Sequence, residues 1–259
     1  MESLFSWIGQ HVLLLWAIVL ILALLAGDRL WYLARRRRLA ATGRNDYLAL
    51  QPHTAATLLA LFGTLFVLLC WAVWTHTALV RFDAALAQAL HEQLRPDVLG
   101  VVALVTGIGQ PALLMVAAAA VALLLALGRD WRSFVPWCVA LGGTAACGEA
   151  AKQFVKRARP FGGHAFVAET GYSFPSGHAM MSMAFFGMLA YLLLHRLPPR
   201  RHRATVAIAV ALVASVGISR VVLQAHYLSD VLAGYALGAF WLVLGIALAE
   251  RLRHDARAR

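Results

Sequence analysis

Three short groups of polar residues stand out in a chain that is otherwise 61% hydrophobic. They are Lys152 with Arg159, then Pro175-Ser176-Gly177-His178, then Ser219-Arg220 followed by His226 and Asp230. An ionisable group at the centre of a membrane helix costs roughly 2.5–3.5 kcal/mol on insertion scales, so clusters of such groups indicate a functional site. We expect the three groups to converge in the fold.

The cations in these groups have the chemistry of an anion clamp. Lys152, Arg159 and Arg220 supply positive charge, and a guanidinium matches two oxygens of a phosphate with parallel hydrogen bonds. Ser176 and Gly177 begin a predicted helix, where free backbone N–H groups and the positive end of the helix dipole favour an anion. These five residues are therefore predicted to bind phosphate.

The histidines have the chemistry of attack and proton delivery. His226 and Asp230 are four residues apart at the start of a predicted helix, which puts both on one face. The carboxylate can orient the imidazole and stabilise its positive charge, so His226 is a candidate nucleophile. His178 can protonate the leaving oxygen, a role worth roughly 10²–10⁴-fold in rate. The predicted catalytic residues are His226, His178 and Asp230.

Each group alone has a simpler explanation. A lysine or arginine at a helix end is usually an interface anchor, Pro-Ser-Gly-His can be a helix cap, and His-x3-Asp is often a structural hydrogen bond or half of a metal site. The joint order of the groups favours the catalytic interpretation. We expect Glu149 to pair with Lys152 one turn away, and Lys156 and Arg157 to attract an anionic substrate or to meet lipid phosphates.

Seven apolar stretches are expected to carry these groups. They lie at about 11–34, 55–80, 112–127, 133–154, 177–194, 204–222 and 228–248. Their lengths suit a hydrocarbon layer of about 30 Å, so the predicted fold class is all-α, a polytopic membrane helix bundle. Residues 99–106 are too short to span, and the apolar positions between 82 and 90 predict a short helix along the membrane surface.

Basic residues predict the orientation of the bundle. Sixteen of the 23 lysines and arginines fall in loops after the first, third, fifth and seventh spans. Because cytoplasmic loops are rich in Lys and Arg, the N-terminus and the three polar groups are predicted outside and the C-terminus in the cytoplasm. The net charge of +11 therefore reflects topology; no aromatic-interleaved basic stripe points to nucleic acid.

Taken together, the motifs resemble those of the type-2 phosphatidic acid phosphatase superfamily: Lys152-x6-Arg159-Pro160, Pro175-Ser176-Gly177-His178, and Ser219-Arg220-x5-His226-x3-Asp230. The resemblance covers about residues 80–250. It implies a six-helix core, a phosphohistidine intermediate on His226 supported by Asp230, His178 as general acid, and no metal ion or other cofactor.

We divide the chain accordingly. Residues 1–54 are expected to form an added N-terminal transmembrane helix and a basic cytoplasmic linker, which includes the arginine-rich stretch from Arg35. Residues 55–250 are the expected phosphatase membrane domain, and residues 251–259 are a basic cytoplasmic tail.

The favoured function is hydrolysis of undecaprenyl diphosphate to undecaprenyl phosphate at the outer face of the inner (cytoplasmic) membrane. Phosphatidylglycerol phosphate and phosphatidic acid are alternative substrates, because the motifs do not select between them, and a lipid phosphotransferase is a further alternative. A non-catalytic lipid-binding or transport protein would not require His178, His226 and Asp230. The expected partners are the lipid phosphate and membrane lipids, without nucleic acid; the oligomeric state stays open.

Overall fold

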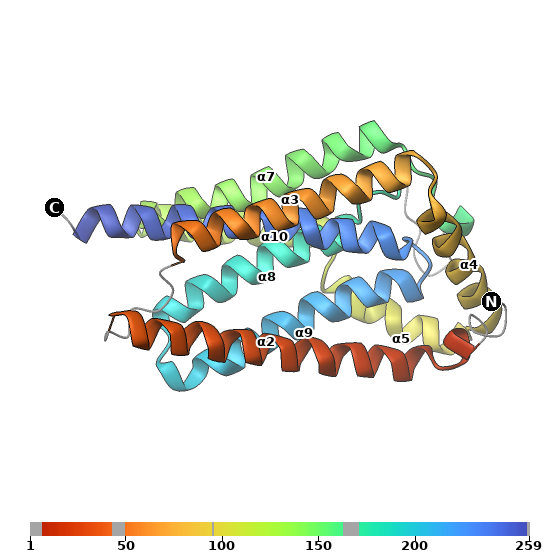
Figure 1. Cartoon of the computed structure of the whole chain (residues 1–259), viewed down its shortest axis with the longest axis horizontal. Coiled ribbons are helices and arrows are strands. Elements are labelled where there is room, and N and C mark those ends of the chain that lie inside the picture. Colours follow the sequence, from red (N-terminus) through yellow and green to blue (C-terminus); the bar gives the residue numbers. More distant parts are fainter. Residues whose placement is uncertain (1–6, 43–49, 95, 163–170, 258–259) are drawn as a thin grey trace.

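The computed structural model describes residues 7–42, 50–94, 96–162 and 171–257, and these contain helices but no strand (Figure 1). The elements are α2 (Val12–Thr42), α3 (Pro52–Trp74), α4 (Ala78–Gln93), α5 (Pro96–Gly107), α6 (Pro111–Leu127), α7 (Trp131–Val155), the 3₁₀ turn η1 (Pro160–Gly162), α8 (Gly177–Arg196), α9 (Pro199–Val222) and α10 (Leu228–Arg257). The predicted all-α class is confirmed.

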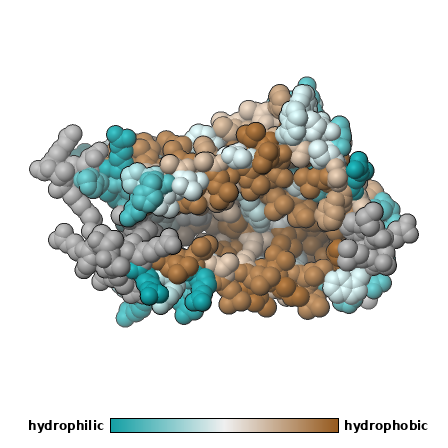
Figure 2. All heavy atoms as spheres, viewed as in Figure 1, coloured by the Kyte–Doolittle hydropathy of each residue, from teal (hydrophilic) through white to brown (hydrophobic). Residues whose placement is uncertain are grey.

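Within the described ranges, six segments are long and apolar enough to cross a membrane. They are Val12–Leu33, Pro52–Trp74, Leu99–Leu127, Gly177–Arg196, Pro199–Val222 and Leu228–His254. Figure 2 shows the corresponding hydrophobic belt over the middle of the molecule, with hydrophilic residues gathered toward the ends.

Two expected spans differ from this set. The third was expected at 112–127, with residues 99–106 excluded, but the apolar segment runs from Leu99 to Leu127 through the break between α5 and α6. The fourth, α7, has 25 residues but is rich in glycine, alanine and polar side chains, and it is absent from the six apolar segments. It still runs along α8 and α10 within the bundle (Figure 1).

Several helix ends also differ from the expected boundaries. The arginine-rich stretch expected as linker continues α2 as far as Thr42, and the expected tail continues α10 as far as Arg257. The second span ends at Trp74, because residues 75–77 form a turn before α4. Apolar patterning marks the segment inside a membrane, whereas a helix can extend beyond it into the polar region, so such ends are not predictable from hydropathy.

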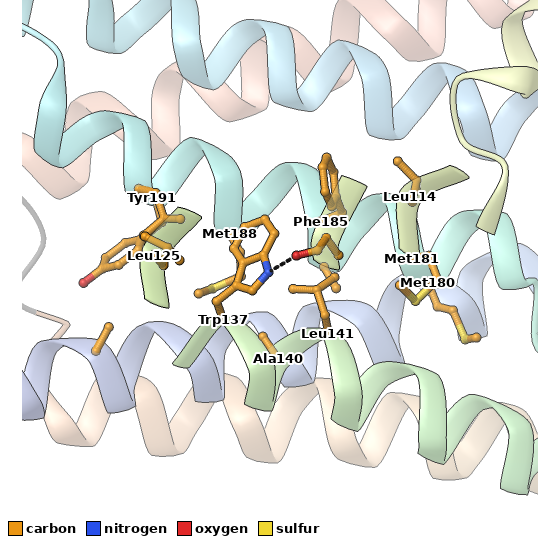
Figure 3. Packing of buried hydrophobic residues seen from close by; sticks show 14 of the residues in the cluster. Leu114, Leu125, Trp137, Ala140, Leu141, Met180, Met181, Phe185, Met188 and Tyr191 are labelled. Carbon is orange, nitrogen blue, oxygen red and sulfur yellow. Dashed lines mark hydrogen bonds between the residues drawn. The ribbon is translucent and has the colours of Figure 1, made fainter. Parts of the chain in front are cut away.

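The main core lies between α6, α7, α8 and α10. Figure 3 shows Trp137 packed among Phe185, Met188 and Leu141, with its indole pointing at a backbone oxygen. The indole Nε1 donates to the carbonyl oxygen of Ala118 at 3.0 Å, which satisfies the one polar atom of this buried side chain. The core holds α8 against α10, the two helices that position most of the candidate site.

Contacts at one end of the bundle confirm that the chain threads up and down. Arg196 donates to Asp130 at 3.0 Å, Arg203 donates to Asp28 at 2.9 Å, and the Arg253 guanidinium donates to Ser133 at 3.0 Å. These contacts join α2 to α9, the start of α7 to the end of α8, and α7 to α10. The three polar groups of the sequence therefore lie at the opposite end, near α4 (Figure 1).

Candidate active site

The start of α8 sits directly on the first turns of α10. The backbone N–H of Ser176 donates to the carbonyl oxygen of Asp230 at 3.0 Å. A Cβ on Gly234 would lie 2.7 Å from the Ser176 carbonyl oxygen, and one on Gly238 would lie 2.5 Å from that of Met180. Glycines four residues apart thus let the two backbones approach closely, as small residues do at membrane helix contacts.

The Pro-Ser-Gly-His group begins α8 as expected. Ser176 is the N-cap residue, is fully buried, and its hydroxyl accepts from the Ala179 N–H at 3.5 Å. A Cβ on Gly177 would lie 3.7 Å from the ammonium nitrogen of Lys152, at the end of α7. The structure therefore brings a lysine cation to a helix N-terminus, the combination that favours an anion.

The imidazole of His226 is held in one orientation. Its Nδ1 lies 2.7 Å from the carbonyl oxygen of Ser173, and its Nε2 lies 3.2 Å from Nη1 of Arg159. A carbonyl oxygen only accepts and a guanidinium only donates, so we assign the proton to Nδ1 and the lone pair to Nε2. The nitrogen available for attack therefore faces the cation of Arg159.

Asp230 contributes to this arrangement less directly than its spacing indicates. His226 lies in the turn before α10, not on its helical face, and Asp230 Oδ2 is 3.6 Å from Nδ1. That separation is outside a normal hydrogen bond, although charge stabilisation acts over it. The carboxylate instead accepts from the Tyr227 N–H at 3.0 Å and from the Ser173 hydroxyl.

Arg159 contacts the histidine through its side chain, and Arg220 through its backbone. Besides His226, Arg159 donates to the carbonyl oxygens of Ala225 at 2.8 Å and Gly171 at 3.1 Å. Arg220 is fully buried, and its Nη1 donates to the hydroxyl of Thr106 at 3.0 Å. The Arg220 carbonyl oxygen accepts from the His226 N–H at 3.3 Å, which ties the arginine to the nucleophile candidate through the backbone.

All eight predicted site residues lie at this end of the bundle. Direct contacts link Arg159, His226, Asp230 and Ser176, and Lys152 lies against Gly177. His178 is in the first turn of α8 and only 7% exposed. Their roles as nucleophile, acid or phosphate ligand remain predictions.

Four residues of the site were not singled out by sequence reasoning: Ser173, Thr106, Asp83 and Ser229. Ser173 acts through its carbonyl oxygen, which any residue type provides. Asp83 carries a detectable signal, because it falls on the buried face of α4 with Leu86, Ala87 and Leu90. A carboxylate among buried apolar positions requires a polar or charged partner.

The structure corrects two expectations about charged residues. Arg157 points inward rather than toward lipid: it contacts Asp230 at 2.6 Å and Asp83 at 2.9 Å. Glu149 accepts from Gln153 at 2.8 Å, and its expected pairing with Lys152 is not among the ion pairs of the described residues. Within those residues, no group of three or more His, Cys, Asp or Glu side chains is placed to hold a metal ion.

Comparison with known families gives a match over the part of the chain that contains the candidate site. Residues 133–253 match the model of the PAP2 superfamily, which is the superfamily that the three motifs resemble. The chain carries a PAP2 superfamily domain. The match extends from the start of α7 into the last turns of α10 and contains all eight predicted site residues.

Curated relatives are similar to parts of this chain. It is 41% identical to phosphatidylglycerophosphatase B of Bacillus subtilis over 98 residues, which are 36% of this chain and 48% of that protein. It is 39% identical to lipid A 1-phosphatase of Rhizobium johnstonii over 102 residues, 36% of this chain and 38% of that protein. The chain thus matches less than half the length of either relative.

A solved structure matches over a longer range. The crystal structure of a transmembrane PAP2-type phosphatidylglycerolphosphate phosphatase from Bacillus subtilis superposes with a TM-score of 0.64 and 27% identity. The match covers 78% of this chain and 97% of that one. Together with the apolar helices, it indicates that the PAP2 domain here belongs to a multi-pass membrane protein.

Proposed function

We propose that this protein is a membrane phosphatase that removes phosphate from a lipid through a phosphohistidine on His226. The observation that carries the proposal is the position of the His226 ring, with Nε2 3.2 Å from Nη1 of Arg159 and Nδ1 2.7 Å from the Ser173 carbonyl oxygen. A neutral imidazole held against a cation is arranged to attack an anion that the cation binds.

In the proposed reaction, Lys152, Arg159 and Arg220 hold the phosphate oxygens together with the N-terminus of α8. His226 Nε2 attacks phosphorus, so a P–N bond forms while the P–O bond to the lipid breaks. His178 donates a proton to the leaving lipid oxygen. Asp230, 3.6 Å from Nδ1, stabilises the positive charge that develops on the imidazole.

Water completes the proposed cycle. His178, now deprotonated, takes a proton from the water that attacks phosphorus, and the P–N bond breaks to release inorganic phosphate. This sequence returns both histidines to their starting states and requires no metal ion in the proposed mechanism.

The substrate class follows from where the site lies. It is at the end of a bundle of apolar helices (Figure 2), where a lipid presents its headgroup. Phosphatidylglycerol phosphate is the first substrate to test, because a relative and a solved structure with that named activity are similar to this chain. Undecaprenyl diphosphate, favoured by the initial hypothesis, and phosphatidic acid are the competing substrates.

Phosphate release by the purified protein in detergent with a chelator tests the proposal. We expect turnover of at least one of the three lipids, and a loss of about 10³-fold or more for His226→Ala, as for other essential nucleophiles. His178→Ala is expected to lose about 10²-fold, the lower range for a general acid. Normal turnover by His226→Ala, or turnover that stops with the chelator, would contradict the mechanism.

A further inference from the structure

A buried arginine bridges two carboxylates behind the candidate nucleophile. Arg157 donates through Nη1 to Asp230 Oδ1 at 2.6 Å and through Nη2 to Asp83 Oδ2 at 2.9 Å. The side chain of Arg157 is 8% exposed, and both carboxylates are fully buried. Arg157 lies in the loop after α7, Asp83 on α4 and Asp230 on α10, so one guanidinium connects three separate parts of the chain.

Asp83 also completes the start of α10. It accepts from the backbone N–H of Ser229 at 3.2 Å and from the hydroxyl of the same serine. The first N–H groups of a helix have no partner within the helix, and a carboxylate there is stabilised by the helix dipole. Arg157 Nη1 donates to the Ser229 hydroxyl as well, at 2.8 Å. Asp83 thus fixes the residue immediately before Asp230.

The hydrogen bonds of Asp230 hold its carboxylate in one orientation. Oδ1 accepts from Arg157, whereas Oδ2 accepts from the Tyr227 N–H at 3.0 Å and from the Ser173 hydroxyl. Oδ2 is the oxygen nearest the His226 ring, at 3.6 Å from Nδ1. Arg157 therefore holds the oxygen that faces away from the histidine, and so sets where the other oxygen points.

The aromatic ring of Tyr227 packs against the Arg157 guanidinium. The Arg157 guanidinium lies 4.0 Å from the centre of the Tyr227 ring, within the range of a cation–π contact. Burial raises the pKa of the Tyr227 phenol, against the lowering effect of Arg157, so the ring is a neutral cover for the guanidinium. The two buried ion pairs of this guanidinium are costly to break, because removing one partner leaves an uncompensated buried charge.

We propose that Asp83 and Arg157 are positioning residues for the Asp230–His226 pair, acting through the carboxylate of Asp230 and through Ser229. The inference rests on the proposed function, since it assigns the network to the orientation of the proposed nucleophile. Neither residue belongs to the predicted phosphate site, so their loss is expected to slow the chemical step while leaving lipid binding nearly intact.

Kinetics of matched carboxylate variants test the proposal. Asp83→Asn removes the negative charge that faces Arg157 and keeps the shape of the side chain. Glu92→Gln makes the same change at an exposed site on the same helix. We expect Asp83→Asn to lower kcat at least about tenfold with KM within about twofold, the pattern of an interaction made in the transition state. Glu92→Gln is expected to keep both constants.

Arginine variants separate positioning from charge alone. Arg157→Lys keeps the charge but cannot fork to two carboxylates, so we expect kcat between those of the parent protein and Arg157→Gln. The double variant Asp83→Asn with Arg157→Gln is expected to lose no more kcat than the worse single variant, because coupled residues are not additive. Additive losses, or an unchanged kcat in Asp83→Asn, would overturn the proposal.

Hydrogen exchange gives a readout that does not need turnover. Mass spectrometry of the segment 223–232 reports the Tyr227 and Ser229 N–H groups, which donate to Asp230 and Asp83. Exchange there is expected to rise in Asp83→Asn and not in Glu92→Gln. Unchanged exchange in Asp83→Asn would overturn the positioning role, whereas absent phosphate release by the parent protein would overturn only the proposed function.

Discussion

At the scale of single residues, the candidate nucleophile is oriented by a backbone carbonyl. The Ser173 carbonyl oxygen accepts a hydrogen bond from His226 Nδ1 at 2.7 Å, while Asp230 Oδ2 lies 3.6 Å from the same nitrogen. The spacing of His226 and Asp230 predicted their proximity correctly. It could not predict the hydrogen bond to the Ser173 carbonyl, because every residue type has a backbone carbonyl oxygen.

The charge of Asp230 can be separated from its hydrogen bond with Ser173 by mutation. Ser173→Ala keeps the carbonyl and removes the hydroxyl, which donates to Asp230 and lies 3.4 Å from His226 Nδ1, so we expect kcat to fall by less than about tenfold. Asp230→Asn removes the charge that stabilises the imidazolium, and we expect a loss of about 10²-fold or more. A larger loss in Ser173→Ala than in Asp230→Asn, measured as kcat under saturating lipid, would contradict this division.

Arg220 supplies a second test at this scale. Its guanidinium donates to the Thr106 hydroxyl, and both side chains are buried. Thr106→Val removes this acceptor with little change in volume, and we expect weaker lipid binding, seen as a KM increase of about three- to tenfold. Thr144→Val is the matched control: Thr144 is equally buried but bonds to the Ala140 carbonyl of its own helix. An unchanged KM in Thr106→Val would contradict the role of this contact.

The motif residues were predictable because charged residues make up only 14% of this apolar chain and the motif residues stand in three compact groups. Asp83 was within reach of the same reasoning, since its position three and four residues before Leu86 and Ala87 places it on the buried face of α4. The inward direction of the Arg157 side chain was not predictable, because an arginine at a membrane edge is equally suited to contact lipid phosphates. Only the position of Asp83 in space distinguishes the two.

At the scale of elements, the site depends on how closely α8 and α10 approach. Gly234 faces the Ser176 carbonyl, and the same turn carries the hydrogen bond from Ser176 to Asp230. The membrane-spanning helices were mostly predictable from apolar length, and α4 from the spacing of its apolar residues. The break between α5 and α6 falls between Gly107 and Pro111, where glycine and proline interrupt the apolar run in the sequence. The polar extension of α2 depends on surroundings outside the membrane, which hydropathy does not report.

Gly234→Ala tests the close approach. The added Cβ would meet the Ser176 carbonyl at 2.7 Å, so α8 must shift or the protein loses about 1–3 kcal/mol of stability by overpacking. We expect a lower Tm in detergent together with reduced kcat. Gly142→Ala is the control, because a Cβ there meets nothing within 4 Å. Equal stability and activity of the two variants would argue against the close contact.

At the scale of the whole molecule, alternating helices separate a basic end from the site end. The ion pairs Arg196–Asp130 and Arg203–Asp28 belong to the basic end. The structure defines the two ends relative to each other, and the direction relative to the cell stays a prediction from the positive-inside rule. The distribution of basic residues was enough to predict the two ends, because this arrangement depends on whole loops and not on side-chain packing.

Cysteine labelling in intact cells tests the direction. In a background without the three native cysteines, we place one at Glu92 near the site and one at Arg201 at the basic end; both positions are exposed. We expect a membrane-impermeant thiol reagent to label Glu92→Cys and to spare Arg201→Cys until the cells are opened. The reverse pattern would put the site in the cytoplasm.

The central claim, that His226 carries the phosphate, is tested most directly by trapping the intermediate. The protein is mixed with ³²P-labelled lipid phosphate in the presence of a chelator, quenched within the first turnover, digested at alkaline pH and mapped by mass spectrometry. The account predicts phosphate on the imidazole of His226, a label that His226→Ala lacks. Label on another residue, or phosphate release at the parent rate by His226→Ala, would contradict it.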